Sequence, residues 1–88
     1  MPVYTLEKRE NIDKIFSKLA KRNPKQMHII YKKLKQVLED PQRFKPLRSD
    51  MKNYREVHID KHFVLIYSVD EVRRVVILED YDHHENIF

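Results

Sequence analysis

The 88-residue sequence contains no glycine and no cysteine, and it has no long run of apolar residues. Without glycine, the chain cannot form the glycine-rich loops that hold phosphates in many nucleotide-binding folds. Without cysteine, it can form neither a disulfide framework nor a thiolate metal site. No apolar stretch approaches the ~20 residues that a bilayer-spanning helix needs. Residues 1–4 lack the charged and then apolar layout of a signal peptide, so we expect a cytoplasmic protein with no membrane partner.

The length and the 41% share of hydrophobic residues allow one domain with a single core, which we expect to span residues 1–88. Charge is distributed unevenly along this domain. Residues 1–55 carry 15 Lys and Arg against 6 Asp and Glu, whereas residues 56–88 carry 3 against 8. The basic half is typical of a protein with a polyanionic partner such as nucleic acid, and equally of a solvated, lysine-rich helix surface. Charge alone does not decide between the two.

Two amphipathic helices are predicted in the first half of the chain. A short β-prone run at residues 3–6 precedes the first helix, which covers about residues 8–22 and has apolar residues at the i, i+3, i+4, i+7 spacing of one helical face. Asn23 and Pro24 are typical of an N-cap followed by the first residue of a new helix. This second helix repeats the apolar spacing as far as Asp40. The two helices should form a hairpin whose shared apolar face needs a cover.

Three strands are predicted in the second half, after a basic, proline-containing loop at residues 41–53. They cover residues 54–59, 63–69 and 72–78, and the short connections between them indicate an antiparallel meander. The middle strand of the three is apolar on both faces, so it should lie in the interior of the sheet. The polar residues 80–88 are expected to form no element of their own. The predicted fold is therefore α+β, in the order β-α-α-β-β-β, with the N-terminal helical hairpin packed on one face of a small, mainly antiparallel sheet.

Four of the five histidines lie outside the helices, and they are the candidate chemical groups. Strand alternation places Glu56 and His58 together, on what we expect to be the open face of the sheet. His62 follows at the next turn, and His83 and His84 lie in the polar tail. Histidine suits metal-free RNA cleavage, because its pKa of ~6.5 lets one imidazole deprotonate the ribose 2′-OH and another protonate the leaving 5′-oxygen. Lysine or arginine can offset the phosphate charge, and an aromatic ring can stack on an unpaired base.

Each candidate also has a structural interpretation. His58 can be an ordinary exposed strand residue, and Glu56 can belong to a cross-strand ion pair rather than orient an imidazole or act as a base. Phe88, the last residue, can pin the tail to the core. A metal site is not expected, because adjacent histidines in an extended tail point apart and the sequence has no ligand spacing such as His-x-x-x-His on a helix.

Several short motifs occur in an order that resembles the RelE superfamily of toxins, and most closely its YafQ-like branch. The motifs are Pro46-Leu47-Arg48-Ser49, Tyr54-Arg55-Glu56-Val57-His58-Ile59, Leu65-Ile66-Tyr67 and His84-Glu85-Asn86-Ile87-Phe88. The match covers about residues 44–88, and the helical hairpin before it agrees with the topology of that family. The resemblance implies a type II toxin: a cytoplasmic endoribonuclease that uses no metal or other cofactor and cuts messenger RNA in the ribosomal A site. It also implies a cognate antitoxin that wraps the toxin and is encoded next to it.

The resemblance assigns acid/base duty to His58 and His84, which look like the strand histidine and the C-terminal histidine of the YafQ-like site. His62 stands where that branch has an aspartate, and with Glu56 it completes the candidate catalytic residues. Asp80 stands where such toxins often have an arginine, which removes a cation that would face the phosphate.

The resemblance also points to residues that would bind RNA. Lys45 and Arg48 would engage phosphate, while Phe63 and Phe88 would position the base. Lys45 replaces a histidine of the YafQ-like branch, and a lysine can bind phosphate but is a poor base at neutral pH unless its pKa is strongly depressed. Arg55 belongs to the shared pattern, but strand alternation turns it away from His58, so we expect it to be structural or secondary.

Two other functions stay open at this point. The related ParE toxins share the fold but inhibit DNA gyrase without cutting RNA, an action that has no need of a histidine pair. A degenerate toxin that binds RNA without cleaving it is the other alternative, because Lys45 and Asp80 depart from the YafQ-like pattern.

Overall fold

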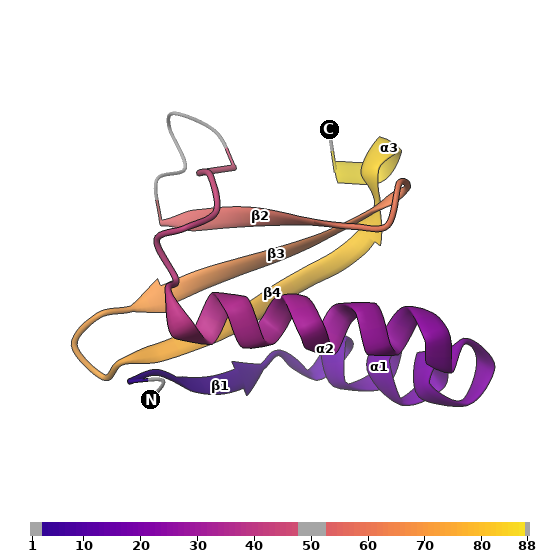
Figure 1. The fold of residues 1–88 in the computed structure, drawn as a ribbon, viewed down its shortest axis with the longest axis horizontal. Coiled ribbons are helices and arrows are strands. Elements are labelled where there is room, and N and C mark those ends of the chain that lie inside the picture. The colour runs from indigo at the N-terminus through magenta and orange to yellow at the C-terminus, as the bar shows by residue number, and fades with distance from the viewer. Residues whose placement is uncertain (1–2, 48–52, 88) are drawn as a thin grey trace.

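The computed structural model describes residues 3–47 and 53–87, which form a four-stranded sheet with two long helices on one of its faces (Figure 1). A third, very short helix follows the last strand. No helix in the described ranges is long and apolar enough to cross a bilayer. In chain order the elements are β1 (Thr5–Lys8), α1 (Glu10–Arg22), α2 (Pro24–Glu39), β2 (Tyr54–Ile59), β3 (Phe63–Asp70), β4 (Val75–His83) and α3 (His84–Ile87).

The strands lie in the order β1-β4-β3-β2, which confirms the interior position predicted for β3. β2, β3 and β4 form the expected antiparallel meander. β1, which starts two residues later than predicted, joins β4 in parallel. The helical hairpin makes this possible because it carries the chain from β1 at one edge of the sheet to β2 at the other edge. The predicted fold, with two helices on one face of a mainly antiparallel sheet, is therefore confirmed.

The start of α2 is set by the residues that the sequence marks. The Asn23 side chain accepts a hydrogen bond from the backbone N–H of Gln26 at 3.2 Å, and Pro24 occupies the first turn, where its missing N–H is not needed. The buried side chain of Gln26 in turn donates to the hydroxyl of Tyr81. The break between the two helices is therefore tied to the last part of β4.

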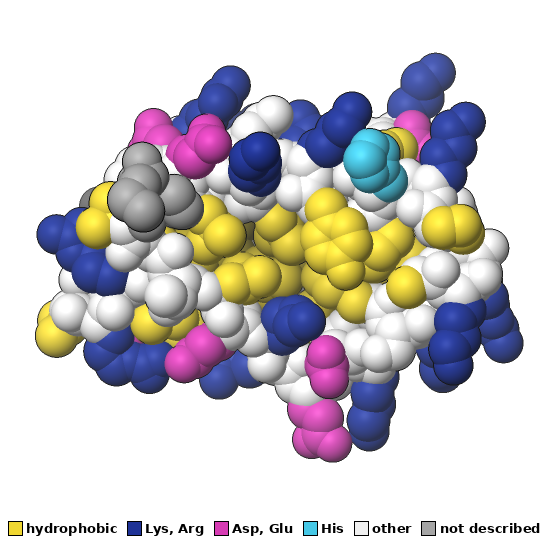
Figure 2. All heavy atoms as spheres, turned by 60° about the horizontal axis from the view of Figure 1, so that its bottom comes forward, with side chains coloured by type: hydrophobic (Ala, Val, Ile, Leu, Met, Phe, Trp, Pro, Cys, Tyr) yellow, Lys and Arg dark blue, Asp and Glu magenta, His cyan; other side chains and the backbone are white. Residues whose placement is uncertain are grey.

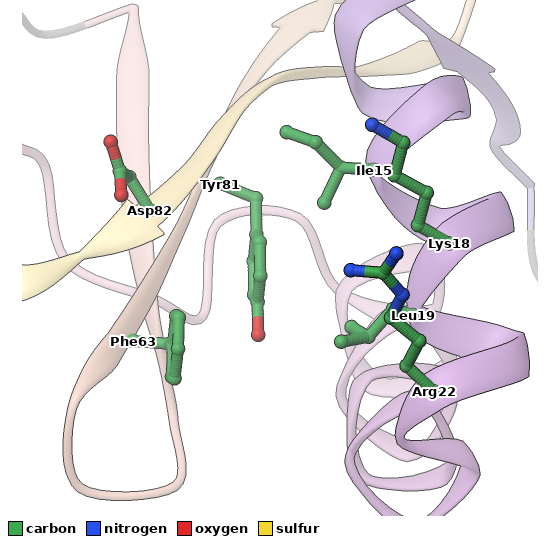
Figure 3. Close-up of a pocket in the computed structure, with 7 residues that line it drawn as sticks. All are labelled: Ile15, Lys18, Leu19, Arg22, Phe63, Tyr81 and Asp82. Carbon is green, nitrogen blue, oxygen red and sulfur yellow. The ribbon is translucent and has the colours of Figure 1, made fainter.

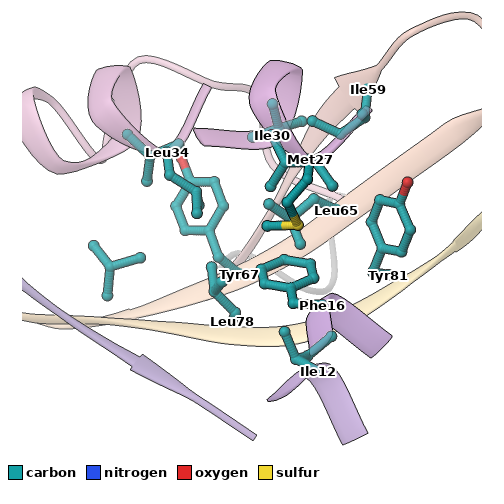
Figure 4. Close-up of a cluster of buried hydrophobic side chains, with 13 residues drawn as sticks. Ile12, Phe16, Met27, Ile30, Leu34, Ile59, Leu65, Tyr67, Leu78 and Tyr81 are labelled. Carbon is teal, nitrogen blue, oxygen red and sulfur yellow. The ribbon is translucent and has the colours of Figure 1, made fainter. Parts of the chain in front are cut away.

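The core lies between the helices and the sheet face that they cover (Figure 4). Fully burying one aliphatic side chain contributes roughly 1.5–3 kcal/mol, so this layer of contacts supplies most of the drive to fold. The buried cluster consists of Ile12, Phe16, Met27, Ile30, Leu34, Val37, Val57, Ile59, Leu65, Tyr67, Val76, Leu78 and Tyr81.

Apolar and basic side chains share the outer surface of the helical side of the molecule. Figure 2 shows a band of apolar side chains there, with many Lys and Arg and several Asp and Glu side chains around its margin. Tyr31 of α2 contributes to the exposed apolar surface, with 60% of its area accessible. An exposed apolar surface with charged residues around it is typical of a surface that binds another macromolecule.

β4 ends five residues later than the sequence predicts. The expectation that residues 80–88 form no element is wrong, because residues 80–83 pair with residues 63–66 of β3 beyond a register shift at Ile66 and Tyr67. Aspartates are uncommon in strands, which hides this segment from a propensity argument. Here Asp80 and Asp82 alternate with the buried Tyr81, so of these three residues only the tyrosine enters the core. The extension carries the chain directly into α3.

A hydroxyl in the core offers a test of how the end of α2 is held to the sheet. Tyr67 is fully buried, and its hydroxyl donates a hydrogen bond of 2.7 Å to the carbonyl of Pro41, just beyond α2. Burial raises the pKa of Tyr67 to about 12, so the ring is neutral near pH 7. Tyr67→Phe leaves that carbonyl without its donor and should lower the free energy of unfolding by about 1–2 kcal/mol. Urea unfolding at pH 7 measures the change, and an unaltered midpoint would contradict this role.

Candidate active site

Two histidines from different elements meet at the end of the sheet where β2 and β4 finish. His58 belongs to β2 and His84 begins α3, and their ring centroids lie 5.7 Å apart with the planes inclined by 31°. Both residues are exposed. The backbone N–H of His84 donates a hydrogen bond of 2.7 Å to the carbonyl of His62, which holds the start of α3 against the turn between β2 and β3. The fold thus brings together the two histidines that the family resemblance singles out.

These two rings border a surface hollow of about 250 Å³, which we call the histidine hollow. Its walls come from the end of β2, the β2–β3 turn and the junction of β4 with α3. Four of its six lining residues are histidines, a concentration of groups that can accept and donate protons near neutral pH. The lining residues are His58, Lys61, His62, His83, His84 and Glu85.

Lys61, His83 and Glu85 line the histidine hollow, although the sequence analysis gives none of them a role in the site. Lys61 lies in the short turn after β2, where its charge alone gave no signal. His83 is the last residue of β4 and lies directly opposite Phe63 of β3. Its place depends on the extension of β4, so the interpretation of residues 80–88 as a tail named His83 as a candidate but gave it no position.

Phe63 does not join the histidine hollow. Its side chain packs against the core on the helical face, stacks on Tyr81 with ring centroids 5.2 Å apart, and contacts the ring of His83 at 4.3 Å. Strand alternation explains this position, because the neighbouring residue Val64 is the one that pairs with His58. The part expected of Phe63 in positioning a base therefore stays a prediction, with its ring next to His83 at the border of the histidine hollow.

Glu56 lies beside His58 but is buried, although we expected it to be exposed on the open face. Its side chain is only 6% exposed, and its Oε1 atom lies 3.6 Å from His58 Nε2 and 3.8 Å from Lys45 Nζ. Residues 45–47 cause part of this difference, because they pair with the outer edge of β2: the backbone N–H of Glu56 donates to the Lys45 carbonyl at 3.2 Å. Lys45 of this loop and His58 of β2 thus lie next to one buried carboxylate.

One oxygen of this carboxylate lacks a hydrogen-bond partner among residues 3–47 and 53–87. Glu56 Oε2 is inaccessible to solvent and accepts no hydrogen bond in those ranges. A buried charged atom without a donor lowers stability. Groups of this kind are typical of functional sites, where folding stability is sacrificed for chemistry.

Arg55 holds the loop that carries Lys45. Its Nη1 donates to the carbonyl of Phe44 at 2.5 Å, and its Nη2 donates to Gln42 Oε1 at 2.6 Å. These bonds agree with the structural role that we expect for Arg55, because strand alternation turns its side chain away from His58. Arg55 fixes the backbone just before Lys45, and so it helps to set the position of that cation.

A carboxylate on β4 secures α3, and with it His84. Asp82 Oδ1 accepts hydrogen bonds from Asn86 Nδ2 at 3.0 Å and from the backbone N–H of His83 at 2.7 Å. The bond from Asn86 and then that from His83 lower the pKa of Asp82, so it stays ionised at neutral pH. The Asp82 carboxylate therefore links the end of β4 to Asn86 of the short helix α3.

The remaining candidates are placed as follows. Arg48 and Phe88 lie outside the described residues. Asp80 is exposed on β4, and its carboxylate accepts the backbone N–H of Tyr81 at 2.8 Å. In the part of the chain that the structure describes, no three His, Asp or Glu side chains are arranged to hold a metal ion.

Comparison with known proteins points to one family of toxins. The family model described as ParE toxin of type II toxin-antitoxin system, parDE, matches residues 3–87. In sequence, the chain is similar to a protein of Methanocaldococcus jannaschii assigned as toxin RelE4. The two are 42% identical over 86 residues, which covers 98% of this chain and 92% of that protein.

The fold is similar to that of solved toxins. A mutant of E. coli toxin RelE in the free state superposes with a TM-score of 0.78 and 24% identity, over 94% of this chain and 85% of that one. YafQ from E. coli strain BL21(DE3) gives a TM-score of 0.71 and 21% identity, over 97% and 98% of the two chains. At these identities the likeness concerns the fold.

Glu56 Oε2, which lacks a hydrogen-bond partner among the described residues, allows a test that needs no activity assay. Glu56→Gln keeps the shape of the side chain and removes the buried charge, so the free energy of unfolding should rise by about 1 kcal/mol. Glu79→Gln is the matched control. Burial raises the pKa of Glu79, but hydrogen bonds from Arg9 and Ser68 outweigh this effect and lower the pKa below its usual value. That control should be destabilised in urea unfolding at pH 7. An equal loss of stability in both variants would show that Glu56 is an ordinary paired carboxylate.

Proposed function

The chain belongs to the ParE toxin family of type II toxin-antitoxin systems, within the RelE/ParE superfamily, and we propose that it inhibits translation by cleaving messenger RNA on the ribosome. The observation that carries the proposal is the pair of exposed imidazoles of His58 and His84, 5.7 Å apart in the histidine hollow. The proposed enzyme is an endoribonuclease that uses its own side chains for acid/base chemistry. Membership of a type II system also implies an antitoxin partner.

In this reaction the ribose 2′-oxygen bonds to the adjacent phosphorus and the bond from phosphorus to the 5′-oxygen breaks, which leaves a 2′,3′-cyclic phosphate and a free 5′-hydroxyl. One imidazole takes the proton of the 2′-OH and the other gives a proton to the 5′-oxygen, so no proton is gained or lost overall. A ring separation of 5.7 Å is short enough for His58 and His84 to contact one phosphodiester. Either histidine can supply the base, and the other then supplies the acid.

Cations next to the hollow can stabilise the negative charge that develops on the phosphate in the transition state. Lys61 lines the hollow, and the side chain of Lys45 is largely solvent-exposed next to Glu56. Arg48 is proposed as a further phosphate ligand and Phe88 as the aromatic residue that closes the site. His62, in the wall of the hollow, is the third candidate for proton transfer.

Glu56 is proposed as the residue that positions His58. Its Oε1 lies 3.6 Å from His58 Nε2, which is longer than a hydrogen bond in the free protein, so a small movement on substrate binding would bring the two into contact. Because the carboxylate is buried and fixed on the same strand, it can restrict the imidazole without being exposed to solvent itself.

The choice of substrate follows from family resemblance and charge. The net charge of +4 and the basic helical surface favour association with a polyanion such as the ribosome and its message. Because ribosomes are cytoplasmic, this proposal also places the protein in the cytoplasm.

Gyrase inhibition is the second candidate function, because the matching family model carries the ParE name. It would leave the histidine hollow without a chemical task, since a non-catalytic inhibitor needs no pair of proton-transfer groups. An RNA-binding protein without cleavage activity is the third alternative, and it is motivated by Lys45 and Asp80.

Alanine variants of the two histidines test the proposed chemistry. We expect His58→Ala and His84→Ala each to slow cleavage of a message on translating ribosomes by about a hundredfold or more, because each removes a proton-transfer group. The matched control is His28→Ala, which removes an exposed histidine of α2 and should leave the rate unchanged. Primer extension maps the cuts, and circular dichroism verifies that the variants are folded.

Two results would overturn this assignment. One is cleavage by folded His84→Ala at the rate of the unaltered protein. The other is an intact message with the unaltered protein together with loss of gyrase supercoiling activity, which would establish the gyrase candidate instead.

A further inference from the structure

A network of hydrogen-bonded side chains crosses the end of the sheet that lies opposite the histidine hollow. The Tyr4 hydroxyl donates to Glu71 Oε2 at 2.9 Å, and Gln42 Nε2 donates to Glu71 Oε1 at 2.8 Å. Gln42 Oε1 accepts from Arg55 Nη2 at 2.6 Å, and Arg55 Nη1 donates to the carbonyl of Phe44 at 2.5 Å. We call Tyr4, Gln42, Arg55 and Glu71 the Gln42 network. It joins the residue before β1, the β3–β4 turn, the loop after α2 and the start of β2 (Figure 1).

Gln42 is the centre of this network, because its one amide group bonds to both a cation and an anion. The amide oxygen accepts from the guanidinium of Arg55, and the amide nitrogen donates to the carboxylate of Glu71. The backbone around Gln42 is also held. Its N–H donates to Asp40 Oδ1 at 3.2 Å, and the carbonyl of Pro41 accepts a hydrogen bond of 2.7 Å from a buried tyrosine of β3. Gln42 therefore ties Arg55 to an anchored part of the chain.

Arg55 connects this network to the proposed phosphate ligand Lys45. The carbonyl that Arg55 binds belongs to Phe44, the residue before Lys45. The Lys45 carbonyl accepts the backbone N–H of Glu56 at 3.2 Å, and Lys45 Nζ lies 3.8 Å from Glu56 Oε1. Because Arg55 and Glu56 are neighbours on β2, their bonds hold two consecutive residues of the loop. A displaced Arg55 should therefore move Lys45 relative to Glu56 and to His58 beside it.

The network bonds place the loop more than they stabilise the fold. The bonds of Gln42 and Glu71 join exposed side chains, where water competes for the same groups and the gain in stability is small. The Lys45 side chain is 76% exposed, so packing does not hold it in place. A long, exposed side chain meets a phosphate at a fixed position only if its backbone is ordered.

We propose that Gln42 and Glu71 are positioning residues for the proposed RNA cleavage. Acting through Arg55, they hold the loop so that Lys45 lies beside Glu56 and can contact the phosphate of the substrate. The inference rests on the proposed function and extends it to residues at the far end of the sheet, which do not touch the RNA themselves.

A double-mutant cycle in the cleavage of messages on translating ribosomes tests this coupling. Gln42→Ala removes both side-chain bonds of the residue, and we expect it to lower kcat about fivefold with little change in KM, because it misplaces a group that acts in the transition state. In a Lys45→Ala background the same change should have no further effect, since the cation that it positions is gone. The matched control is Arg73→Ala, which breaks an ion pair of 2.8 Å between the same β3–β4 turn and β1 and should leave kcat unchanged.

Two variants of Glu71 separate geometry from charge. Glu71→Ala removes both acceptors and should lower kcat as Gln42→Ala does. Glu71→Gln keeps the shape of the side chain: its amide oxygen can accept from Gln42, and its amide nitrogen can donate to the Tyr4 hydroxyl. This variant should therefore restore most of the rate that Glu71→Ala loses, whereas a role of the negative charge alone would make the two variants equally slow.

Amide hydrogen exchange measures the position of the loop without any activity. The N–H groups of Glu56 and Leu47 donate to the carbonyls of Lys45 and Tyr54. In Gln42→Ala both amides should exchange about tenfold faster, because the loop separates from β2 more often. The amide of Leu65, in the interior strand β3, should keep its rate and so show that the variant is folded and globally stable.

Two results would overturn the inference. One is an equal loss of kcat from Gln42→Ala with and without Lys45, which would show that the network acts independently of that cation. The other is unchanged exchange of Glu56 and Leu47 in Gln42→Ala. Failure of the proposed function is recognised separately, because the unaltered protein would then leave the message intact whatever the exchange rates are.

Discussion

The pairing of the last residues of β4 with the first residues of β3 is the constraint on which the rest of the site depends. Beyond the register shift at Ile66 and Tyr67, this pairing carries the chain to His83 opposite Phe63. The backbone bond from His84 to the His62 carbonyl then fixes the start of α3 beside the β2–β3 turn. The end of β2 and the start of α3, which are separated by two whole strands in the sequence, are thereby held at one end of the sheet, and the imidazoles of His58 and His84 face one hollow.

The same pairing separates two surfaces with different chemistry. On one side of the end of β4 lies the histidine hollow, polar and lined by proton-transfer groups. On the other side lies a hollow of about 350 Å³ between α1 and the end of β4, where apolar side chains such as Ile15 and Leu19 lie next to Lys18 and Arg22 (Figure 3). His83 and Phe63 form the boundary between them, with their rings 4.3 Å apart. The end of β4 therefore separates a polar surface from an apolar one.

Three features were enough to predict the architecture: the spacing of apolar residues along the two helices, the N-cap at Asn23, and the strand that is apolar on both of its faces. Each reflects a local rule that packing in the core does not override. The fine placement of the site was harder to predict. Polar residues 80–83 become a strand only because β3 offers them partners, which is a long-range condition that propensity does not contain. The burial of Glu56 depends in part on the loop at residues 45–47, and the position of Phe63 depends on which face of β3 the helices cover. His58 and His84 were found because the order of motifs carried information that their individual environments lack.

The most direct test of the account is whether one phosphodiester contacts both imidazoles. A dinucleotide with a 2′-deoxy sugar, which cannot be cleaved, can be titrated into the protein while the ring signals of the histidines are followed by NMR. The account predicts that the signals of His58 and His84 shift together and give the same dissociation constant, while those of His28 stay in place. Shifts of only one of the two rings, or shifts with clearly different dissociation constants, would contradict it.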